Sequence, residues 1–310
     1  MPIAIIVTDR DVSLLKQKTR EYLSGTTPVW VYPDIPAPEA VEMAVVWKHP
    51  AGILNTFPNL KLVSSLGAGV EQILADKNIP PQVAITRIVD GALLSSMRNY
   101  VLMAVLNIHK QFRYYQHNQR EMRWEKPEPV EIPLRIGLLG LGQLGAGIAQ
   151  SLVALGFELW GYSLAPRQIE GVRCMHAENV SPADFASNVN LLICLLPLTK
   201  ATEGVLNIGL FRKMPRGSYL INVARGAHLR EDDLLQAMKE GRIREAWLDV
   251  FREEPLPPSH PFWLYDSIIA TPHIASITNQ DNAARIIAEN YVKLKAGEPL
   301  LFEVSREKGY

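Results

Sequence analysis

Short apolar runs rich in β-branched residues alternate along this chain with longer segments of helical periodicity. This alternation is typical of βα units that build parallel sheets. In the first third of the chain we expect strands at 3–8, 29–32, 43–47, 60–67 and 83–89. A helix is expected from about residue 93 to 115, with Val101, Val105, Ile108 and Phe112 on its apolar face. The polar, proline-rich segment 118–133 is expected to form a loop outside both cores.

A second set of apolar runs follows and predicts strands at 134–140, 157–163, 189–197, 218–224, 246–251 and 267–273. A helical pattern then runs from about residue 278 to 296, and Gly297 is placed to end it. The whole pattern predicts an α/β protein with two doubly wound domains, each built on a parallel sheet. In such folds ligands bind at the carboxyl ends of the strands, so a cleft between the two domains is the expected ligand site.

Composition narrows the class of protein. The chain has 310 residues, of which 47% are hydrophobic, enough for about two domains with proper cores. Lys plus Arg and Asp plus Glu both number 32, whereas nucleic-acid binders usually carry a basic excess. No apolar run approaches the ~18 residues that span a bilayer, and the N-terminal segment lacks the basic start of a signal peptide.

Cysteine and histidine usage adds two expectations. The two cysteines, Cys174 and Cys194, suit a reduced compartment, so we expect a cytoplasmic protein without membrane or nucleic-acid partners. The seven histidines are dispersed and show no ligand spacing, so no metal site is predicted.

The stretch from Gly140 to Gly145 has the Gly-x-Gly-x-x-Gly spacing of a dinucleotide-binding turn. It follows a predicted strand and opens a segment of helical period, and this context makes the motif specific. Gly140 permits the tight turn, Gly142 lets the backbone approach a pyrophosphate, and Gly145 lets helix and strand pack closely. The helix N-terminus then offers N–H groups to the phosphates. The competing interpretation is a glycine-rich turn without a ligand.

The next predicted strand ends in Ser163, where an NAD-binding chain places an Asp or Glu for the ribose hydroxyls. No carboxylate is available here to repel a 2′-phosphate, and Arg167 can reach one. The predicted cofactor is therefore NADPH in preference to NADH. A solvated surface arginine is the competing interpretation of Arg167.

An arginine, a carboxylate and a histidine follow three predicted strands of the second set. Arg225, Glu254 and His273 thus fall on the sheet edge that carries the glycine turn, an arrangement that suits hydride transfer to a 2-keto acid. Arg225 would anchor the substrate carboxylate and polarise the keto oxygen. His273 would donate a proton to that oxygen, and Glu254 would orient the imidazole and favour its protonated form. Taken singly, each has a structural alternative: an ion pair, a solvated loop carboxylate and a histidine at a strand end.

These motifs, in this order, resemble the D-isomer-specific 2-hydroxyacid dehydrogenases over essentially the whole chain. The stretches that carry the resemblance are LGAGVEQI, GLLGLGQLG, LLPLTKATEGVLN, INVARGAHLREDDLLQAM, LDVFREEPLPPSHPFW and TPHIAS. Three features, EPLPPSHPFW, LGAGVEQI and the C-terminal GY, are most similar to glyoxylate/hydroxypyruvate reductases of the bacterial A type. The resemblance places the catalytic residues of the family on Arg225, Glu254 and His273. It implies NADPH-dependent reduction of glyoxylate and hydroxypyruvate to glycolate and D-glycerate.

The resemblance also implies a fold and a set of contacts. A Rossmann-type cofactor domain, residues 99–275, would be inserted into a flavodoxin-like substrate domain made of residues 1–98 and 276–310. The implied cofactor contacts are Gly140, Gly142, Gln143, Leu144, Gly145, Ser163, Arg167, Leu196, Pro197, Val223, Ala224 and Asp249. The implied substrate contacts are Trp47, Leu66, Gly67, Ala68, Gly69, Val70 and Arg225. Asp249 would touch the nicotinamide carboxamide or support the site. One departure is Leu164, which stands where NADP-using relatives often carry an arginine.

The resemblance further implies a homodimer. Residues 119–129 would reach across a two-fold axis with Trp124 at the tip, the alternative being that this tryptophan folds back on its own domain.

Other functions stay open at this point. A 2-keto acid reductase of hydroxyphenylpyruvate or lactate type is the nearest alternative, and formate dehydrogenases of this fold carry a Gln at the position of Glu254. A non-catalytic dinucleotide sensor, like the related transcriptional corepressors, is the alternative from another class.

Overall fold

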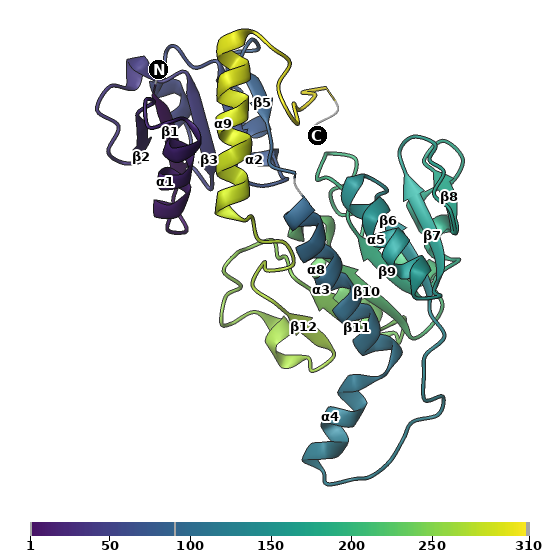
Figure 1. Cartoon of the computed structure of the whole chain (residues 1–310). Helices are drawn as coiled ribbons and strands as arrows, with labels where there is room; N and C mark the ends of the chain where they lie inside the picture. Colours follow the sequence, from purple (N-terminus) through teal and green to yellow (C-terminus); the bar gives the residue numbers. More distant parts are fainter. Residues whose placement is uncertain (1, 90, 308–310) are drawn as a thin grey trace. The chain divides into compact units, whose positions relative to one another are not determined.

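The computed structural model describes residues 2–89 and 91–307, so the C-terminal GY lies outside the described residues. The chain divides into two compact units (Figure 1). Unit 1 comprises Met1–Leu93 and Ile277–Tyr310, and unit 2 comprises Leu94–Ser276. The first boundary lies five residues before the predicted 98/99 and the second lies one residue after the predicted 275/276. A single helix runs through both positions of the first boundary, so the sequence pattern offers no break there.

Unit 1 is built on a five-stranded parallel sheet in the order β2-β1-β3-β4-β5. Its strands are β1 Ile3–Val7, β2 Val29–Val31, β3 Met43–Trp47, β4 Leu62–Ser65 and β5 Ala84–Thr86. Its helices are α1 Ser13–Tyr22, α2 Glu71–Ala75 and α9 Gln280–Ala296, with 3₁₀ turns η1 Pro38–Ala40 and η2 Ile53–Thr56. This strand order is that of flavodoxin-like folds. Helix α9 packs beside α1 on one face of the sheet, as the resemblance implied for the C-terminal helix (Figure 1).

Unit 2 holds a seven-stranded parallel sheet in the order β12-β11-β10-β9-β6-β7-β8. Its strands are β6 Arg135–Leu139, β7 Glu158–Ser163, β8 Val172–His176, β9 Leu191–Cys194, β10 Ser218–Asn222, β11 Ile243–Leu248 and β12 Ile268–Ala270. Its helices are α4 Phe112–Arg120, α5 Gln143–Ala154, α6 Pro182–Ala186, α7 Ile208–Lys213 and α8 Glu231–Lys239, the greater part of α3 Gly91–His109, and the 3₁₀ turns η3 Gly226–His228 and η4 Pro261–Leu264. The strand order reverses between β9 and β6, which is the Rossmann arrangement with its ligand crevice at that point.

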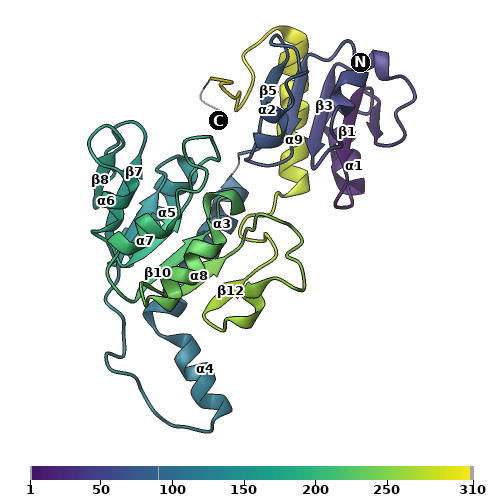
Figure 2. The ribbon, with the colours of Figure 1, turned by 180° about the vertical axis from the view of Figure 1, so that it is seen from behind.

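Two helical layers cover this second sheet. Helices α3 and α5 cover one face (Figure 1), whereas α7 and α8 cover the other (Figure 2). Both faces of the sheet are therefore shielded from solvent. This explains why β9 is an unbroken apolar run with every residue buried. The predicted α/β class, with a Rossmann-type and a flavodoxin-like domain, is confirmed.

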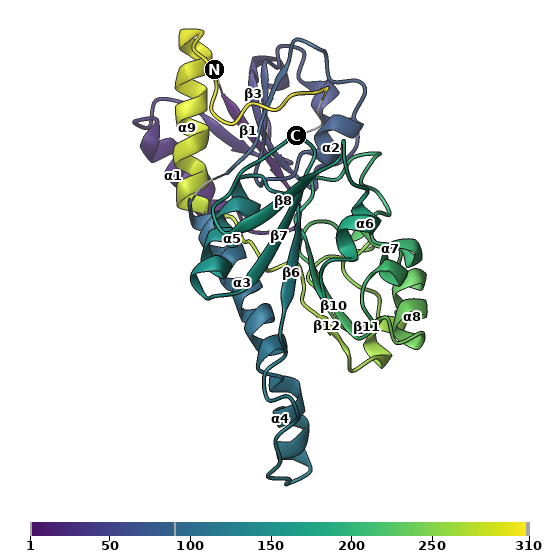
Figure 3. The same cartoon turned by 90° about the vertical axis from the view of Figure 1, so that its right-hand side faces the viewer.

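Four details differ from the sequence prediction. The helix expected over 93–115 is two helices, because Gln111 adopts a left-handed conformation with φ 52°. Val101, Val105 and Ile108 are buried as expected, but Phe112 lies on α4 and is half exposed. The first three residues of the expected loop 118–133 complete α4, and Figure 3 shows α4 extending away from the rest of unit 2. Strand β8 was not predicted, because this edge strand is only half buried and has no apolar run.

Candidate active site

The three glycines of the turn after β6 serve different ends. A Cβ on Gly145 would lie 2.0 Å from the Gly140 carbonyl oxygen, and one on Gly140, where φ is +109°, would lie 2.8 Å from the Leu195 carbonyl oxygen. A Cβ on Gly142, in contrast, would meet no protein atom within 4 Å. Gly140 and Gly145 are thus required by the fold, whereas Gly142 leaves space at the helix N-terminus where a ligand can approach.

Helix α5 begins directly after Gly142, with Gln143 and Leu144 in its first turn, and no side chain caps its N-terminus. Backbone N–H groups at such a helix start, together with the helix dipole, favour an anion. The turn therefore fits the pyrophosphate of a dinucleotide.

The remaining predicted cofactor residues lie at the carboxyl ends of neighbouring strands. Leu196 and Pro197 follow β9, and Val223 and Ala224 follow β10. Ser163 is the last residue of β7 and is 8% exposed; its hydroxyl donates to the Ala165 carbonyl at 2.7 Å. Arg167 is exposed four residues further on.

His273 and Glu254 form a direct pair. Nδ1 of His273 lies 2.8 Å from Oε2 of Glu254, and the other carboxylate oxygen accepts the Phe251 N–H at 3.1 Å. A carboxylate in this place fixes the ring orientation and stabilises the protonated imidazole. Since Nδ1 is engaged, a proton given to a substrate would leave from Nε2.

The backbone around His273 is held by Asp249, which is 1% exposed. The Asp249 carbonyl accepts the His273 N–H at 2.9 Å. Its carboxylate accepts the N–H groups of Ile274 and Ala275, each at 2.8 Å, and the Thr271 hydroxyl at 2.6 Å. Burial raises the pKa of the Asp249 carboxyl, while these donors and His273 act in the opposite direction. Of the two roles expected for Asp249, these contacts favour support of the site.

Arg225 lies at the turn between β10 and η3 and is half buried. One guanidinium nitrogen donates to the Ala224 carbonyl at 2.6 Å. The Asn222 side chain fixes the same turn, since it accepts the Ala224 N–H at 3.2 Å and donates to the Arg225 carbonyl at 3.1 Å.

His228 supports this turn, a role that the sequence alone does not indicate. It is fully buried. Its Nδ1 accepts the Arg225 N–H at 3.2 Å, and its Nε2 lies 3.3 Å from the Pro197 carbonyl oxygen. Its Nδ1 also lies 3.1 Å from the Arg225 carbonyl oxygen, so the ring contacts both backbone polar groups of Arg225. The sequence around His228 carries no pattern that indicates this role.

The substrate-binding residues predicted for unit 1 lie together at the carboxyl end of its sheet. A Cβ on Gly67 would lie 2.6 Å from the Trp47 ring, so this side chain packs directly on the loop backbone. The Ser65 hydroxyl donates to the Gly69 carbonyl at 2.6 Å, and Thr278 donates to the Leu66 carbonyl at 2.8 Å. Loop 66–70, including Ala68 and Val70, is therefore ordered by contacts within unit 1.

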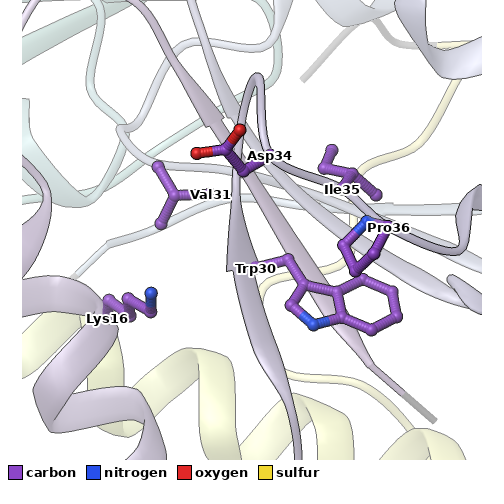
Figure 4. Close-up of a pocket in the computed structure, with 6 residues that line it drawn as sticks. All are labelled: Lys16, Trp30, Val31, Asp34, Ile35 and Pro36. Carbon is purple, nitrogen blue, oxygen red and sulfur yellow. The ribbon is translucent and has the colours of Figure 1, made fainter.

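A separate pocket of unit 1 lies beside the edge strand β2 (Figure 4). Its lining residues are Lys16, Trp30, Val31, Asp34, Ile35 and Pro36. None of them belongs to the predicted site. Among the described residues, no group of three or more His, Cys, Asp or Glu side chains can hold a metal ion. In the same part of the chain, helices long and apolar enough to cross a membrane are absent.

Residues 102–275 match the family described as "D-isomer specific 2-hydroxyacid dehydrogenase, NAD binding domain". The match covers more than half of the chain. The chain belongs to the D-isomer specific 2-hydroxyacid dehydrogenase family. Its expected activity class, an NAD(P)-dependent 2-hydroxyacid dehydrogenase, is thereby confirmed.

Relatives of known name agree with this assignment. The chain is 43% identical over 263 residues to glyoxylate/hydroxypyruvate reductase A of Serratia proteamaculans (strain 568), which covers 83% of this chain and 84% of the relative. It is 41% identical over 275 residues to the protein of the same name from Photorhabdus laumondii, which covers 87% and 88%.

Two solved structures share the entire fold. A D-isomer specific 2-hydroxyacid dehydrogenase from Xanthobacter autotrophicus Py2, in complex with NADPH and MES, is 36% identical with a TM-score of 0.93, covering 100% of this chain and 99% of that one. An NADPH-dependent glyoxylate/hydroxypyruvate reductase from Sinorhizobium meliloti, in complex with NADP and sulfate, is 30% identical with a TM-score of 0.89 and the same coverage.

Proposed function

We propose that this dehydrogenase reduces glyoxylate to glycolate and hydroxypyruvate to D-glycerate. The observation that carries the proposal is the 2.8 Å contact between His273 Nδ1 and Glu254 Oε2, in the unit that also holds the glycine turn. It joins a proton donor to a dinucleotide-binding fold, which is what reduction of a keto group needs. The names of the A-type relatives support these two substrates.

The turn at Gly140, Gly142 and Gly145 would hold a nicotinamide dinucleotide, which when bound would supply the hydride for reduction of a keto group. The protonated His273 donates its Nε2 proton to the keto oxygen, and Glu254 stabilises the imidazolium until that transfer. Arg225 binds the substrate carboxylate by charge-assisted hydrogen bonds and polarises the keto oxygen. The substrate contacts that the resemblance implies in unit 1, the backbone of residues 66–70 and the Trp47 side chain, belong to the proposal as well. The hydroxyl product leaves with the histidine neutral, and a solvent proton restores it.

NADPH is the cofactor of this proposal, with NADH used less well. Strand β7 ends in Ser163 without an acidic neighbour that would repel a 2′-phosphate. Arg167 supplies a cation within the same loop, and its exposure leaves the guanidinium accessible. The NADPH and NADP complexes of the two solved relatives support this choice.

Steady-state kinetics test the proposal. We expect the highest kcat/KM for glyoxylate and hydroxypyruvate with NADPH, and lower values for pyruvate and hydroxyphenylpyruvate. A preference for either of the last two would overturn the substrate assignment. An absence of turnover with all four keto acids and both cofactors would overturn the enzymatic role and favour a dinucleotide sensor.

Two further parts of the proposal concern assembly and location. The arm formed by α4 and residues 121–133 extends away from the rest of unit 2 (Figure 3). It carries Met122 and Trp124 at essentially full exposure, and such apolar side chains are commonly covered by a partner. We propose a homodimer that covers them; a monomer in light scattering at micromolar concentration would contradict it. Cys174 and Cys194 are free thiols, consistent with a cytoplasmic location.

A further inference from the structure

A buried tyrosine hydroxyl and a half-buried threonine hydroxyl contact the His273 loop in unit 2. Tyr100, on α3, is 7% exposed, and its hydroxyl oxygen lies 2.6 Å from Oγ1 of Thr271. The Thr271 hydroxyl in turn donates to Oδ1 of Asp249 at 2.6 Å. A threonine hydroxyl has one hydrogen, so Tyr100 is the donor in the first contact. The order of donation therefore runs from Tyr100 to Thr271 to the Asp249 carboxylate.

This chain of hydrogen bonds ends on the group that shapes the loop. The Asp249 carboxylate binds the N–H groups of Ile274 and Ala275, the two residues that follow His273. His273 itself has φ +57°, in the left-handed region that a side chain with a Cβ rarely adopts. Such a conformation is strained and persists only where the surroundings hold it. The carboxylate, bound to both following amides, is the contact that holds it here.

Helix α3 touches the loop at a second point. Ser96 lies one turn before Tyr100, and its hydroxyl donates to the Ala275 carbonyl at 3.3 Å. One face of α3 thus contacts both the Asp249 network and the end of the loop. Burial raises the pKa of Tyr100 to about 12, so its hydroxyl keeps its proton and remains a donor at neutral pH.

We infer that Tyr100 and Thr271 are positioning residues that hold the proton donor His273 in its strained conformation through the Asp249 carboxylate. This inference rests on the proposed function of His273 and extends it to groups that do not touch substrate or cofactor. Loss of either hydroxyl removes a hydrogen bond from the partner that remains, so the loop relaxes and the imidazole leaves the reacting geometry.

Substitutions at Thr271 supply a matched pair. Thr271→Val keeps the shape and removes the hydroxyl, and we expect kcat with glyoxylate to fall roughly 10- to 100-fold, as for a buried group that loses its partner. Thr271→Ser keeps the hydroxyl and should stay within about threefold of the wild type. Affinity for NADPH should change by no more than about twofold in both, because the glycine turn is untouched. Equal damage in both variants would overturn the inference.

Tyr100→Phe is the second variant, and it keeps the test decisive if Thr271→Val does not fold. It should also lower kcat. The double variant with Thr271→Val should have a kcat only slightly below that of Thr271→Val alone, since both substitutions interrupt the same series of hydrogen bonds. Tyr219→Phe is the control. Tyr219 is also buried, but it lies near the amino end of β10, whereas the His273 loop follows the carboxyl end of β12. Tyr219→Phe should leave kcat unchanged.

Hydrogen–deuterium exchange gives a readout that does not depend on activity. Exchange of the peptide containing residues 271–276 should rise in Thr271→Val and Tyr100→Phe and stay at the wild-type level in Thr271→Ser and Tyr219→Phe. Unchanged exchange and kcat in the first two variants would overturn the inference. A wild-type protein without keto acid turnover would instead overturn the proposed function, while the exchange data would still decide whether these hydroxyls hold the loop.

Discussion

The glycine turn after β6 and the histidine loop after β12 lie at the carboxyl ends of strands in one sheet, yet they use their backbone donors in opposite ways. At the glycine turn, α5 begins without a side-chain cap and Gly142 faces open space. In the histidine loop, the N–H groups of His273, Ile274 and Ala275 are all accepted by Asp249. One element leaves its donors for a ligand, and the other uses them internally.

This difference follows from what each element must do. A phosphate-binding turn gains affinity from N–H groups that the protein does not satisfy itself. A proton donor must instead keep one position, and a left-handed residue such as His273 needs contacts that outweigh its strain. We therefore expect cofactor affinity and chemistry to respond to separate substitutions in unit 2.

The largest effect is expected from His273→Ala. Turnover with glyoxylate should fall by ~10²–10⁴-fold, the usual size of a general-acid contribution, while NADPH affinity stays nearly unchanged. If His273→Ala keeps most of its turnover, His273 is not the proton donor.

The glycine turn can be disrupted in two distinct ways. In Gly145→Ala the new Cβ would lie 2.0 Å from a backbone oxygen, so α5 must shift, with a loss of ~1–3 kcal/mol in the free energy of unfolding and weaker NADPH binding. In Gly142→Ala no protein atom lies within 4 Å, so stability should stay within about 0.5 kcal/mol while NADPH affinity falls. Denaturant unfolding and calorimetric titration measure the two quantities. Equal stability losses would contradict the different roles of these glycines.

Arg225→Lys sharpens the comparison on the catalytic side. Lysine keeps the charge but loses the planar fork, so kcat/KM for glyoxylate should fall roughly 10- to 100-fold, the worth of one charge-assisted contact. Steady-state kinetics at saturating NADPH measure this loss. Near-normal efficiency with both keto acids would remove Arg225 from the site.

A smaller change is expected from Arg167→Ala, beyond the glycine turn. One charge-assisted contact to the 2′-phosphate is worth roughly 1.5–3 kcal/mol. The ratio of kcat/KM for NADPH to that for NADH should therefore fall by about tenfold and by no more than about a hundredfold. The ratio of kcat/KM for the two cofactors measures it. An unchanged ratio would show that Arg167 is only a solvated arginine.

The smallest effect concerns alkaline stability. Burial raises the pKa of Tyr100 from 10.0 to about 12, so below pH 10 its contribution to stability is fully present. Between these values the unfolded chain ionises first, and the contribution is lost as pH rises through the folded pKa. The free energy of unfolding should therefore decline less for Tyr100→Phe than for the wild type over this window. The pKa of Cys194, also raised to about 12 by burial, acts in the same direction in both proteins. Identical declines would contradict the buried, protonated state of Tyr100.

Strands and turns were predictable from the sequence where a single segment carries the apolar pattern or the glycine spacing. Runs such as 43–47 coincide with a strand, and the glycine spacing gave the turn its correct place before α5. Elements without an apolar pattern of their own were not predictable from the sequence. Strand β8 exists because β7 offers an edge to pair with, and the left-handed Gln111 that separates α3 from α4 has no marker in the apolar pattern.

The candidate site shows the same division. The positions of Arg225, Glu254 and His273 at one edge of the sheet were predictable, because each follows a strand of the same parallel sheet. The roles of Tyr100 and His228 were not predictable. Tyr100 lies 171 residues from its partner Thr271 in the sequence. The His228 ring contacts backbone atoms of Arg225 and of Pro197, which lies 31 residues away. Periodicity along a chain does not encode such pairs.

The most direct test measures NADPH affinity and turnover at saturating NADPH in Gly142→Ala and His273→Ala together. We predict that Gly142→Ala loses affinity and keeps its saturated turnover with glyoxylate, whereas His273→Ala loses turnover and keeps its affinity. If the two variants lose both quantities in parallel, the separation of cofactor binding from proton donation between these two elements is wrong.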